Sequence, residues 1–428
     1  GLIFFSTLSL LLLLKWRKDG LRLKWLILSG FCCGIGLGTK YNGLVPFAIL
    51  ALLTPLIYIQ TIGHKEIFQL RKSIQALGCC LLFGMISLIV FSPWCIRNYR
   101  WTGNPVYPLF NSAFQLTEAR SEDPKANGTI RSITLDKSIR KVSFFELRRA
   151  SYNESILDIA LIPVRIFFQG EDGNPKLFDG KMSPILIIFP LLGLLIKRIR
   201  KHPRDFEYSL LLAYSILLIL FVFFRRDMRI RYIAPAIPPL VILSIMGIHG
   251  TLQWAEDKLA GKRAKYRIKV LIGLSLSILC WPNVAYLSDQ FQFVRPIEYL
   301  RGSIGRAQYI STFWKEYPIL QYANKALPEN AVLLSFFIGG RSYYSDREMR
   351  FYEEWFSDKV LKSESIEELC CTLSRHGLTH ILLRKDLFAR WLGDNFNDKQ
   401  KEFIEAFFQT YTVFIMDNSA YSLFEIKE

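Results

Sequence analysis

The sequence has few of the residues that build disulfide scaffolds and many enzyme active sites. Among 428 residues it holds only eight cysteines and five histidines. It contains no Gly-x-Ser-x-Gly, paired Cys-x-x-Cys or phosphate-binding glycine loop, and Cys370, Cys371, His376 and His380 match no zinc-ligand spacing. These absences exclude a disulfide-rich fold and give no reason to expect a cysteine or histidine metal site.

Acidic residues are also scarce, and their distribution is uneven. The chain has 54 Lys and Arg against 37 Asp and Glu, for a net charge of +17, and 51% of its residues are hydrophobic. Residues 1–288 hold 37 basic and 17 acidic side chains, whereas residues 289–428 hold 17 and 20. The sequence therefore predicts a cationic, apolar domain over 1–288 and a near-neutral domain over 289–428, which excludes a disordered chain and a single soluble globule.

Long apolar runs, with no Asp or Glu in their interiors, fill the first domain. A helix that crosses about 30 Å of hydrocarbon needs about 20 such residues. Eight runs are predicted to span a membrane in this fragment, at roughly 1–14, 25–39, 43–61, 74–96, 183–197, 207–224, 232–252 and 269–288. The predicted fold class is an α-helical polytopic membrane protein.

The first run begins at residue 1, and its basic residues follow it instead of preceding it. Lys15, Arg17 and Lys18 stand after the apolar stretch, whereas a signal peptide has its charges before the apolar core and small residues at the cleavage site. We therefore expect Gly1 to lie inside a transmembrane helix and an N-terminal portion of the natural protein to be missing.

The basic residues also predict the orientation of the spans, since Lys and Arg in short loops stay on the cytoplasmic side. Nineteen of them lie in alternate loops, 15–24, 62–73, 197–206 and 253–269. The intervening segments are then extracytoplasmic: 38–42, 97–182, 225–231 and 289–428. Because the loop charges orient the spans, the high net charge gives no reason to expect a nucleic-acid partner.

The C-terminal segment has the pattern of a small extracytoplasmic α/β domain. Residues 331–337 and 379–383 are apolar stretches of strand length, 365–368 form a capping box at the start of a helix, and 411–416 with 420–426 resemble a hairpin. Alternating helices and strands of this kind predict one compact module.

The long outer loop, 97–182, exceeds the length of a plain connector. Residues 144–150 and 156–168 have amphipathic spacing, which predicts interfacial helices. Glu171 and Asp172 are adjacent carboxylates that are candidate ligands for a divalent cation, with a solvated turn as the alternative. No other cofactor is expected.

Cations and tyrosines recur where three segments reach the predicted outer face. Arg225–Arg231 is a short outer loop that is basic against the topological preference, which favours an anion-binding role, with lipid-headgroup contact as the alternative. A phosphate-bearing ligand in the outer leaflet would suit the whole set. The residues predicted to bind it are Lys40, Tyr41, Arg97, Arg229, Arg231 and Tyr232.

The motifs around these residues resemble those of a known superfamily. Gly34–Tyr41, Ser92–Asn98 with Thr102–Pro108, and Arg231–Pro238 are similar to the multispanning GT-C glycosyltransferases. The branch most resembled is the family 39-like group that contains protein O-mannosyltransferases and aminoarabinose transferases. The resemblance covers essentially the whole chain.

The resemblance implies an inverting enzyme of the bacterial inner (plasma) membrane. Such enzymes move a sugar from a polyprenyl-phosphate carrier to a hydroxyl of a lipid, glycan or protein at the extracytoplasmic face. Their catalytic Asp, or Asp–Glu pair, lies in the first outer loop, a region that would precede Gly1. In this chain Asn98, Asn104 and Tyr107 are predicted to shape the turn beside the site.

Three alternatives remain open at this stage. One is a transporter or flippase for lipid-linked sugars, which usually places polar groups near the bilayer midplane. Another is an O-antigen ligase or polymerase, which also uses lipid-linked donors. The third is a non-catalytic scaffold that presents residues 289–428 to partners.

Overall fold

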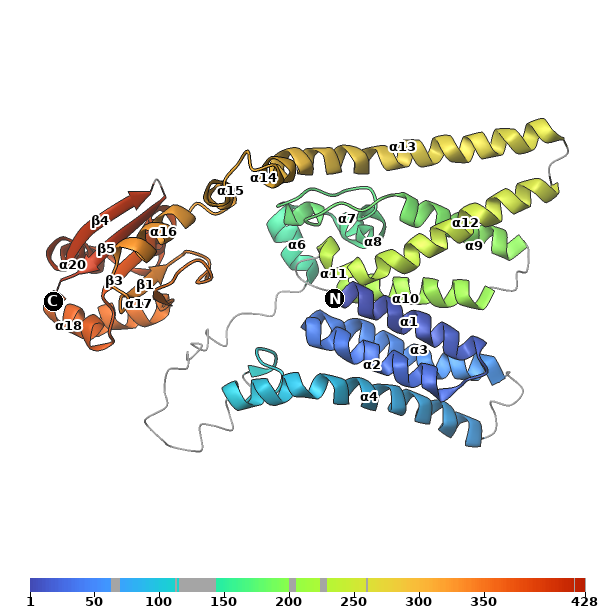
Figure 1. The fold of residues 1–428 in the computed structure, drawn as a ribbon, viewed down its shortest axis with the longest axis horizontal. Helices are drawn as coiled ribbons and strands as arrows, with labels where there is room; N and C mark the ends of the chain where they lie inside the picture. Colours follow the sequence, from blue (N-terminus) through green and yellow to red (C-terminus); the bar gives the residue numbers. More distant parts are fainter. Residues whose placement is uncertain are drawn as a thin grey trace. The chain divides into compact units, whose positions relative to one another are not determined.

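The computed structural model describes residues 1–62, 70–111, 114, 144–199, 205–223, 229–258, 261–418 and 420–427. It divides into two compact units, Gly1–Asp289 and Gln290–Glu428. The first is helical and the second contains a sheet (Figure 1). Each unit is described by itself.

In the first unit, a long helix lies over each of the eight apolar runs. Their bounds are α1 (Leu2–Lys18), α2 (Leu23–Thr39), α3 (Leu44–Ile62), α4 (Leu70–Thr102), α9 (Ile185–Ile199), α10 (Asp205–Phe223), α12 (Ile237–Lys258) and α13 (Lys262–Val294). Continuous apolar sequence favours helices here because a helix satisfies its own backbone hydrogen bonds, which a lipid environment requires.

Four stretches within the described residues are long and apolar enough to cross a membrane. They are Tyr41–Ile62, Arg71–Thr102, Ile230–Lys258 and Lys262–Val294. Leu23–Thr39 and Ile185–Ile196 are shorter apolar helices. The polytopic helical fold therefore agrees with the sequence, while the count of about eight spans stays a prediction.

Small residues bring the helices of this unit close together. A Cβ on Gly34 of α2 would lie 2.5 Å from the carbonyl oxygen of Ser87 on α4, and the Ser87 hydroxyl donates a hydrogen bond to the carbonyl of Gly30 at 2.9 Å. Gly193 of α9 and Gly247 of α12 are also in close contact, since a Cβ on Gly193 would lie 2.9 Å from the Cα of Gly247. Such contacts replace the hydrophobic driving force that lipid does not provide between helices.

The last long helix of this unit, α13, differs from the others because none of its side chains is buried. Ion-pair, hydrogen-bond and cation–π contacts link it to the preceding elements. Lys269 forms an ion pair with Glu256 of α12 at 3.0 Å, and Tyr286 donates a hydrogen bond to Asp172 at 2.7 Å. Its apolar side chains therefore remain available to lipid.

Short helices occupy the described part of the outer loop. They are α6 (Phe144–Tyr152), α7 (Ile156–Ala160), α8 (Ile162–Arg165) and η3 (Pro175–Leu177). The amphipathic stretch 156–168 is thus divided in two, with Pro163 in the first turn of α8. Proline has no N–H to continue the hydrogen bonding of the preceding helix, which explains the division.

The second unit has a five-stranded sheet in the order β2-β1-β3-β5-β4. Strand β1 pairs in parallel with β2 and β3, and β5 pairs antiparallel with β3 and β4. The strands are β1 (Val332–Phe336), β2 (Glu348–Arg350), β3 (His380–Arg384), β4 (Thr412–Asn418) and β5 (Tyr421–Ile426). The helices are α14 (Pro296–Leu300), α15 (Arg306–Phe313), α16 (Tyr317–Ala326), α17 (Glu353–Lys362), α18 (Ile366–Arg375), α19 (Lys385–Asn395) and α20 (Asp398–Tyr411).

The α/β pattern predicted for this region is therefore present. Ser365 caps α18 by accepting a hydrogen bond from the backbone N–H of Glu368. The predicted capping box is incomplete, because the Glu368 carboxylate accepts from the N–H of Glu364 instead of that of Ser365. Two hydrophobic clusters pack against the sheet. Phe336 of β1 lies in one cluster and Leu333 of β1 lies in the other.

Candidate functional site

The ends of α2 and of the short helix α11 (Ile230–Ile233) meet at Tyr232. Lys40 follows α2 in an extended conformation, and its Nζ lies 5.7 Å from the centroid of the Tyr232 ring. The guanidinium carbon of Arg231 lies 5.5 Å from the same centroid. The structure thus places Lys40 near Tyr232 and its sequence neighbour Arg231, which are far from Lys40 along the chain.

Among the described residues, no ion pair neutralises the charges of these two cations. Lys40 and Arg231 are both exposed, and neither pairs with a carboxylate within the described ranges. Tyr232 is half-buried and packs against the core of the first unit. Two uncompensated cations beside one aromatic ring can hold a phosphate group through charge-assisted hydrogen bonds.

Tyr41 lies next to Lys40, but its hydroxyl forms hydrogen bonds with α4 and with the turn that follows it. The hydroxyl donates a hydrogen bond to the carbonyl of Tyr107 at 2.5 Å and accepts one from Asn98 Nδ2 at 2.7 Å. Asn98 is buried on α4 and also donates to the carbonyl of Pro105 at 3.5 Å. The predicted ligand contact of Tyr41 would therefore involve its ring.

The turn after α4 is organised by the fully buried side chain of Asn104. Its Oδ1 accepts a hydrogen bond from the N–H of Val106 at 2.9 Å, and its Nδ2 donates to the carbonyl of Leu109 at 2.9 Å. This is the local backbone bonding that makes asparagine a common turn residue. Asn98, Asn104 and Tyr107 therefore belong to one turn.

Arg97 occupies a different position, on the exposed surface of α4. Its guanidinium lies 4.2 Å from the ring centroid of Trp94 and 4.4 Å from that of Trp101. Among the described contacts, none joins Arg97 to Lys40 or Tyr232. A cation between two tryptophans is typical of a membrane interface.

Arg229, the remaining predicted cation, is paired. Its Nη1 lies 3.1 Å from Oδ2 of Asp179, whose Oδ1 accepts a hydrogen bond from the N–H of Gly173 at 2.9 Å. The N–H of Ile230 also donates to the carbonyl of Phe178 at 3.0 Å. Asp179 is a residue that the sequence did not single out, because nothing local links position 179 to position 229.

Glu171 and Asp172 are exposed and have partners of their own. Glu171 accepts a hydrogen bond from Asn174 Nδ2 at 2.8 Å, and Asp172 accepts one from the hydroxyl of Tyr286 on α13 at 2.7 Å. In the part of the chain that the structure describes, no group of three or more His, Cys, Asp or Glu side chains could hold a metal ion. A metal at Glu171 and Asp172 would need ligands from elsewhere.

A buried ion pair stabilises the short helices beside this region. Arg148 and Glu154, with side chains only 1% and 3% exposed, are joined by two hydrogen bonds of 2.5 and 3.0 Å, and Arg165 adds a bond to Glu154 at 3.1 Å. Burial alone would raise the pKa of Glu154, but the two guanidinium groups outweigh it and hold that pKa below its usual value.

The cations Arg225 and Arg226 of the short outer loop lie outside the described residues. The catalytic carboxylate that the resemblance implies before Gly1 stays a prediction.

A family match at the start of the chain agrees with the resemblance described above. Residues 1–102 match the family model of dolichyl-phosphate-mannose-protein mannosyltransferase. A structural match is the crystal structure of ArnT from Cupriavidus metallidurans bound to undecaprenyl phosphate, with 14% identity, a TM-score of 0.48, and coverage of 99% of this chain and 73% of that one. No curated protein matches the sequence. The family match confirms the similarity to GT-C glycosyltransferases over α1 to α4, the segment that carries Lys40 and Arg97.

Proposed function

We propose that this chain is part of an integral-membrane glycosyltransferase that moves a sugar from a polyprenyl-phosphate carrier to a hydroxyl acceptor. The reaction would take place at the extracytoplasmic face, with residues 1–288 as the transferase domain and 289–428 as an extracytoplasmic module. The observation that carries the proposal is that Lys40 Nζ lies 5.7 Å from the ring of Tyr232, whose sequence neighbour Arg231 is a second exposed cation. The family match over residues 1–102 supports the same reaction class.

The proposed chemistry is a displacement at the anomeric carbon of the sugar. The acceptor oxygen bonds to that carbon while the bond to the carrier phosphate breaks, and a carboxylate takes the acceptor proton. Attack on the face opposite the phosphate inverts the anomeric centre. Negative charge develops on the departing phosphate, and Lys40 and Arg231 stabilise it there without a metal ion.

The two other predicted cations take different parts in this proposal. Arg229 already neutralises Asp179, so it contributes to the position of α11 more than to the phosphate charge. Arg97, between Trp94 and Trp101, suits contact with the carrier near the membrane surface. Lys40 and Arg231 therefore remain as the principal phosphate-binding residues.

A turnover experiment on the full-length natural protein tests the proposal. Purified protein in detergent is given a polyprenyl-phosphate sugar, and the release of polyprenyl phosphate is followed. Lys40→Ala and Arg231→Ala should each lower turnover at least a hundredfold, whereas Arg100→Ala, an exposed arginine near the end of α4, should leave it within about twofold. Normal turnover in both site variants would remove the phosphate-site assignment.

The same experiment separates the proposal from its main rival. A transporter has no turnover in detergent, because it needs two compartments. Binding of the carrier without release of polyprenyl phosphate would therefore favour a transporter or flippase.

A further inference from the structure

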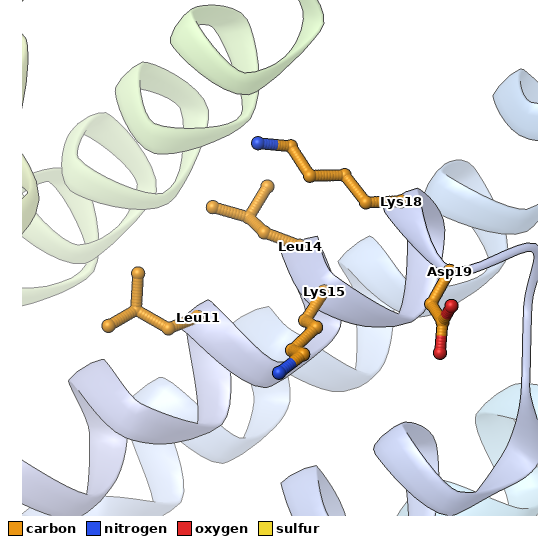
Figure 2. A pocket seen from close by; sticks show the side chains of 5 residues that line it. All are labelled: Leu11, Leu14, Lys15, Lys18 and Asp19. Atoms are coloured by element: carbon orange, nitrogen blue, oxygen red, sulfur yellow. The ribbon is translucent and has the colours of Figure 1, made fainter.

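At the end of α1, the exposed apolar surface stops where the polar residues begin. Leu11 and Leu14 precede Lys15, Lys18 and Asp19, and these five residues line one hollow (Figure 2). Figure 2 shows the two lysine side chains extending to opposite sides of the helix. Every residue of α1 is described, and none of its exposed apolar side chains follows Lys15. The boundary between apolar and polar surface is therefore sharp.

The end of α13 differs, because exposed apolar residues return after a polar interruption. This helix is long and apolar enough to cross a membrane. Asp289 and Gln290 follow its predicted span, 269–288. Phe291 and Phe293 come next in the same helix, and each is more than half exposed. At 1.5 Å per residue they lie roughly 5–8 Å beyond the span, within the polar layer of a bilayer.

The chain turns after α13 and adds two more exposed apolar side chains. Arg295 has a left-handed conformation, φ 51°, and Pro296, which has no N–H to continue a helix, begins α14. The Arg295 guanidinium donates two hydrogen bonds to the Glu298 carboxylate, the one from Nε at 2.9 Å. Ile297 and Leu300 are three residues apart, on one face of α14, and Leu300 is 82% exposed.

Aromatic contacts hold this turn against α15 without burying it. Tyr299 stacks on Tyr309 with ring centroids 4.7 Å apart, and Phe293 meets Phe313 edge to face at 5.5 Å. The structure describes all of α14 and α15, and none of their residues is buried. Exposed apolar patches of this kind mark interaction surfaces.

Two features indicate that the partner of this surface is a lipid bilayer. The segment continues a helix of which no side chain is buried and which has the length and composition of a membrane span. Exposed arginines, Arg301 and Arg306, lie beside Tyr299 and Tyr309 in the sequence. Aromatic and cationic side chains in this combination are typical of the boundary between acyl chains and headgroups.

We propose that residues 291–313 form a membrane-interface anchor at the bilayer surface from which α13 emerges. The side chains of Phe291, Phe293, Ile297 and Leu300 lie at the boundary between acyl chains and headgroups. An interfacial segment of this kind binds through its buried apolar area and through the attraction of its cations to lipid phosphates. The anchor is independent of glycosyl transfer, so it stands even if Lys40 and Arg231 have no role in that reaction.

Fluorescence quenching of the full-length protein in phosphatidylcholine nanodiscs tests the anchor. A genetically encoded fluorescent amino acid replaces Leu300 or, as the control, Tyr343, which is 84% exposed in the loop after β1 of the same unit. The quencher is phosphatidylcholine with a nitroxide near the headgroup end of an acyl chain. It should lower the emission at position 300 at least about twofold and leave position 343 within about a tenth of its value. Aqueous iodide should quench the two positions in the opposite order.

Three outcomes would overturn the proposal. Strong iodide quenching at position 300 without lipid quenching would place Leu300 in water. Protection of position 300 from both quenchers would show that protein covers it, from a second copy or from another part of the chain. Equal lipid quenching at positions 300 and 343 would show general proximity to the bilayer instead of an anchor. If the first labelled protein does not fold, the probe in place of Ile297 must give the result expected for position 300.

Discussion

Asp179 and Arg229 form an ion pair of 3.1 Å that joins the outer loop to the residue preceding α11. The backbone bond from Ile230 to Phe178 runs beside it, so the loop contacts α11 through both side chain and main chain. Since α11 carries Arg231 and Tyr232, the position of the proposed phosphate site depends on this contact.

Exchanging the charges of this pair tests that dependence. Asp179→Arg alone should raise the KM for the lipid-linked donor several-fold, because Arg231 moves relative to Lys40, and should lower stability by about 1 kcal/mol, since both side chains are partly exposed. Asp179→Arg combined with Arg229→Asp should recover most of the loss. A double variant no better than the single one would show that the pair does not position α11.

The hydroxyl of Tyr41 makes a second testable contribution. Tyr41→Phe leaves the buried Nδ2 of Asn98 without its nearest acceptor, which should lower the free energy of unfolding by roughly 1–2 kcal/mol. Thermal unfolding in detergent measures the change. Tyr99→Phe removes an exposed hydroxyl from the same helix end and should have no effect. Equal midpoints for the two variants would contradict the assigned network.

Close helix contact at Gly34 predicts strong sensitivity to added volume. Gly34→Val would force its side chain against the Ser87 carbonyl and Val90, at a cost of about 1–3 kcal/mol. The matched control is Gly273→Val on α13, where nothing lies within 4 Å of the added Cβ. Fluorescence-detected size-exclusion chromatography after heating should show that the folded peak disappears at a lower temperature for Gly34→Val than for the wild type, and not for Gly273→Val.

Stability should fall in acid through the titration of Glu154. Its pKa is lower in the folded than in the unfolded state, so the ion pairs with Arg148 and Arg165 contribute fully above the unfolded pKa of about 4.3. That contribution is lost as the pH falls through the folded pKa. Glu154→Gln should destabilise the protein at pH 7 by roughly 3–5 kcal/mol and flatten the acid side of its pH–stability curve. An unchanged curve would contradict this role.

Removal of divalent cations should leave glycosyl transfer unchanged. Lys40 and Arg231 supply the positive charge in the proposed mechanism. Turnover with and without EDTA checks this expectation. If EDTA abolishes turnover and added Mg²⁺ or Mn²⁺ restores it, Glu171 and Asp172 would be the first candidate metal ligands to test.

The elements that the sequence predicted are those set by local pattern. Uninterrupted apolar runs specify helices such as α3 because each residue needs only its neighbours to form the backbone bonds. Ser365 could be recognised as a cap for the same reason. By contrast, β2 has only three residues, too few to show an alternating pattern.

The site depended more on tertiary contacts than on local pattern. Lys40 and Arg231 could each be selected as basic residues of predicted outer segments, but the approach of Lys40 to Tyr232, the sequence neighbour of Arg231, follows from helix packing. Likewise, the sequence predicted Arg229 to be available to a ligand, because its ion pair with Asp179 forms only in the folded outer loop. Charge placement therefore identified the candidates, and packing distinguished paired from unpaired ones.

The exposed surface of α13 has a consequence for tolerance to substitution. Because none of its side chains is buried, we expect the hydrocarbon thickness to restrict this sequence more than any complementary shape does. Exchanges among Leu, Ile, Val and Phe along α13 should therefore be nearly neutral, whereas α12, which must keep Gly247 against α9, should accept few. Deep mutational scanning would then separate the helices that face lipid from those that face protein.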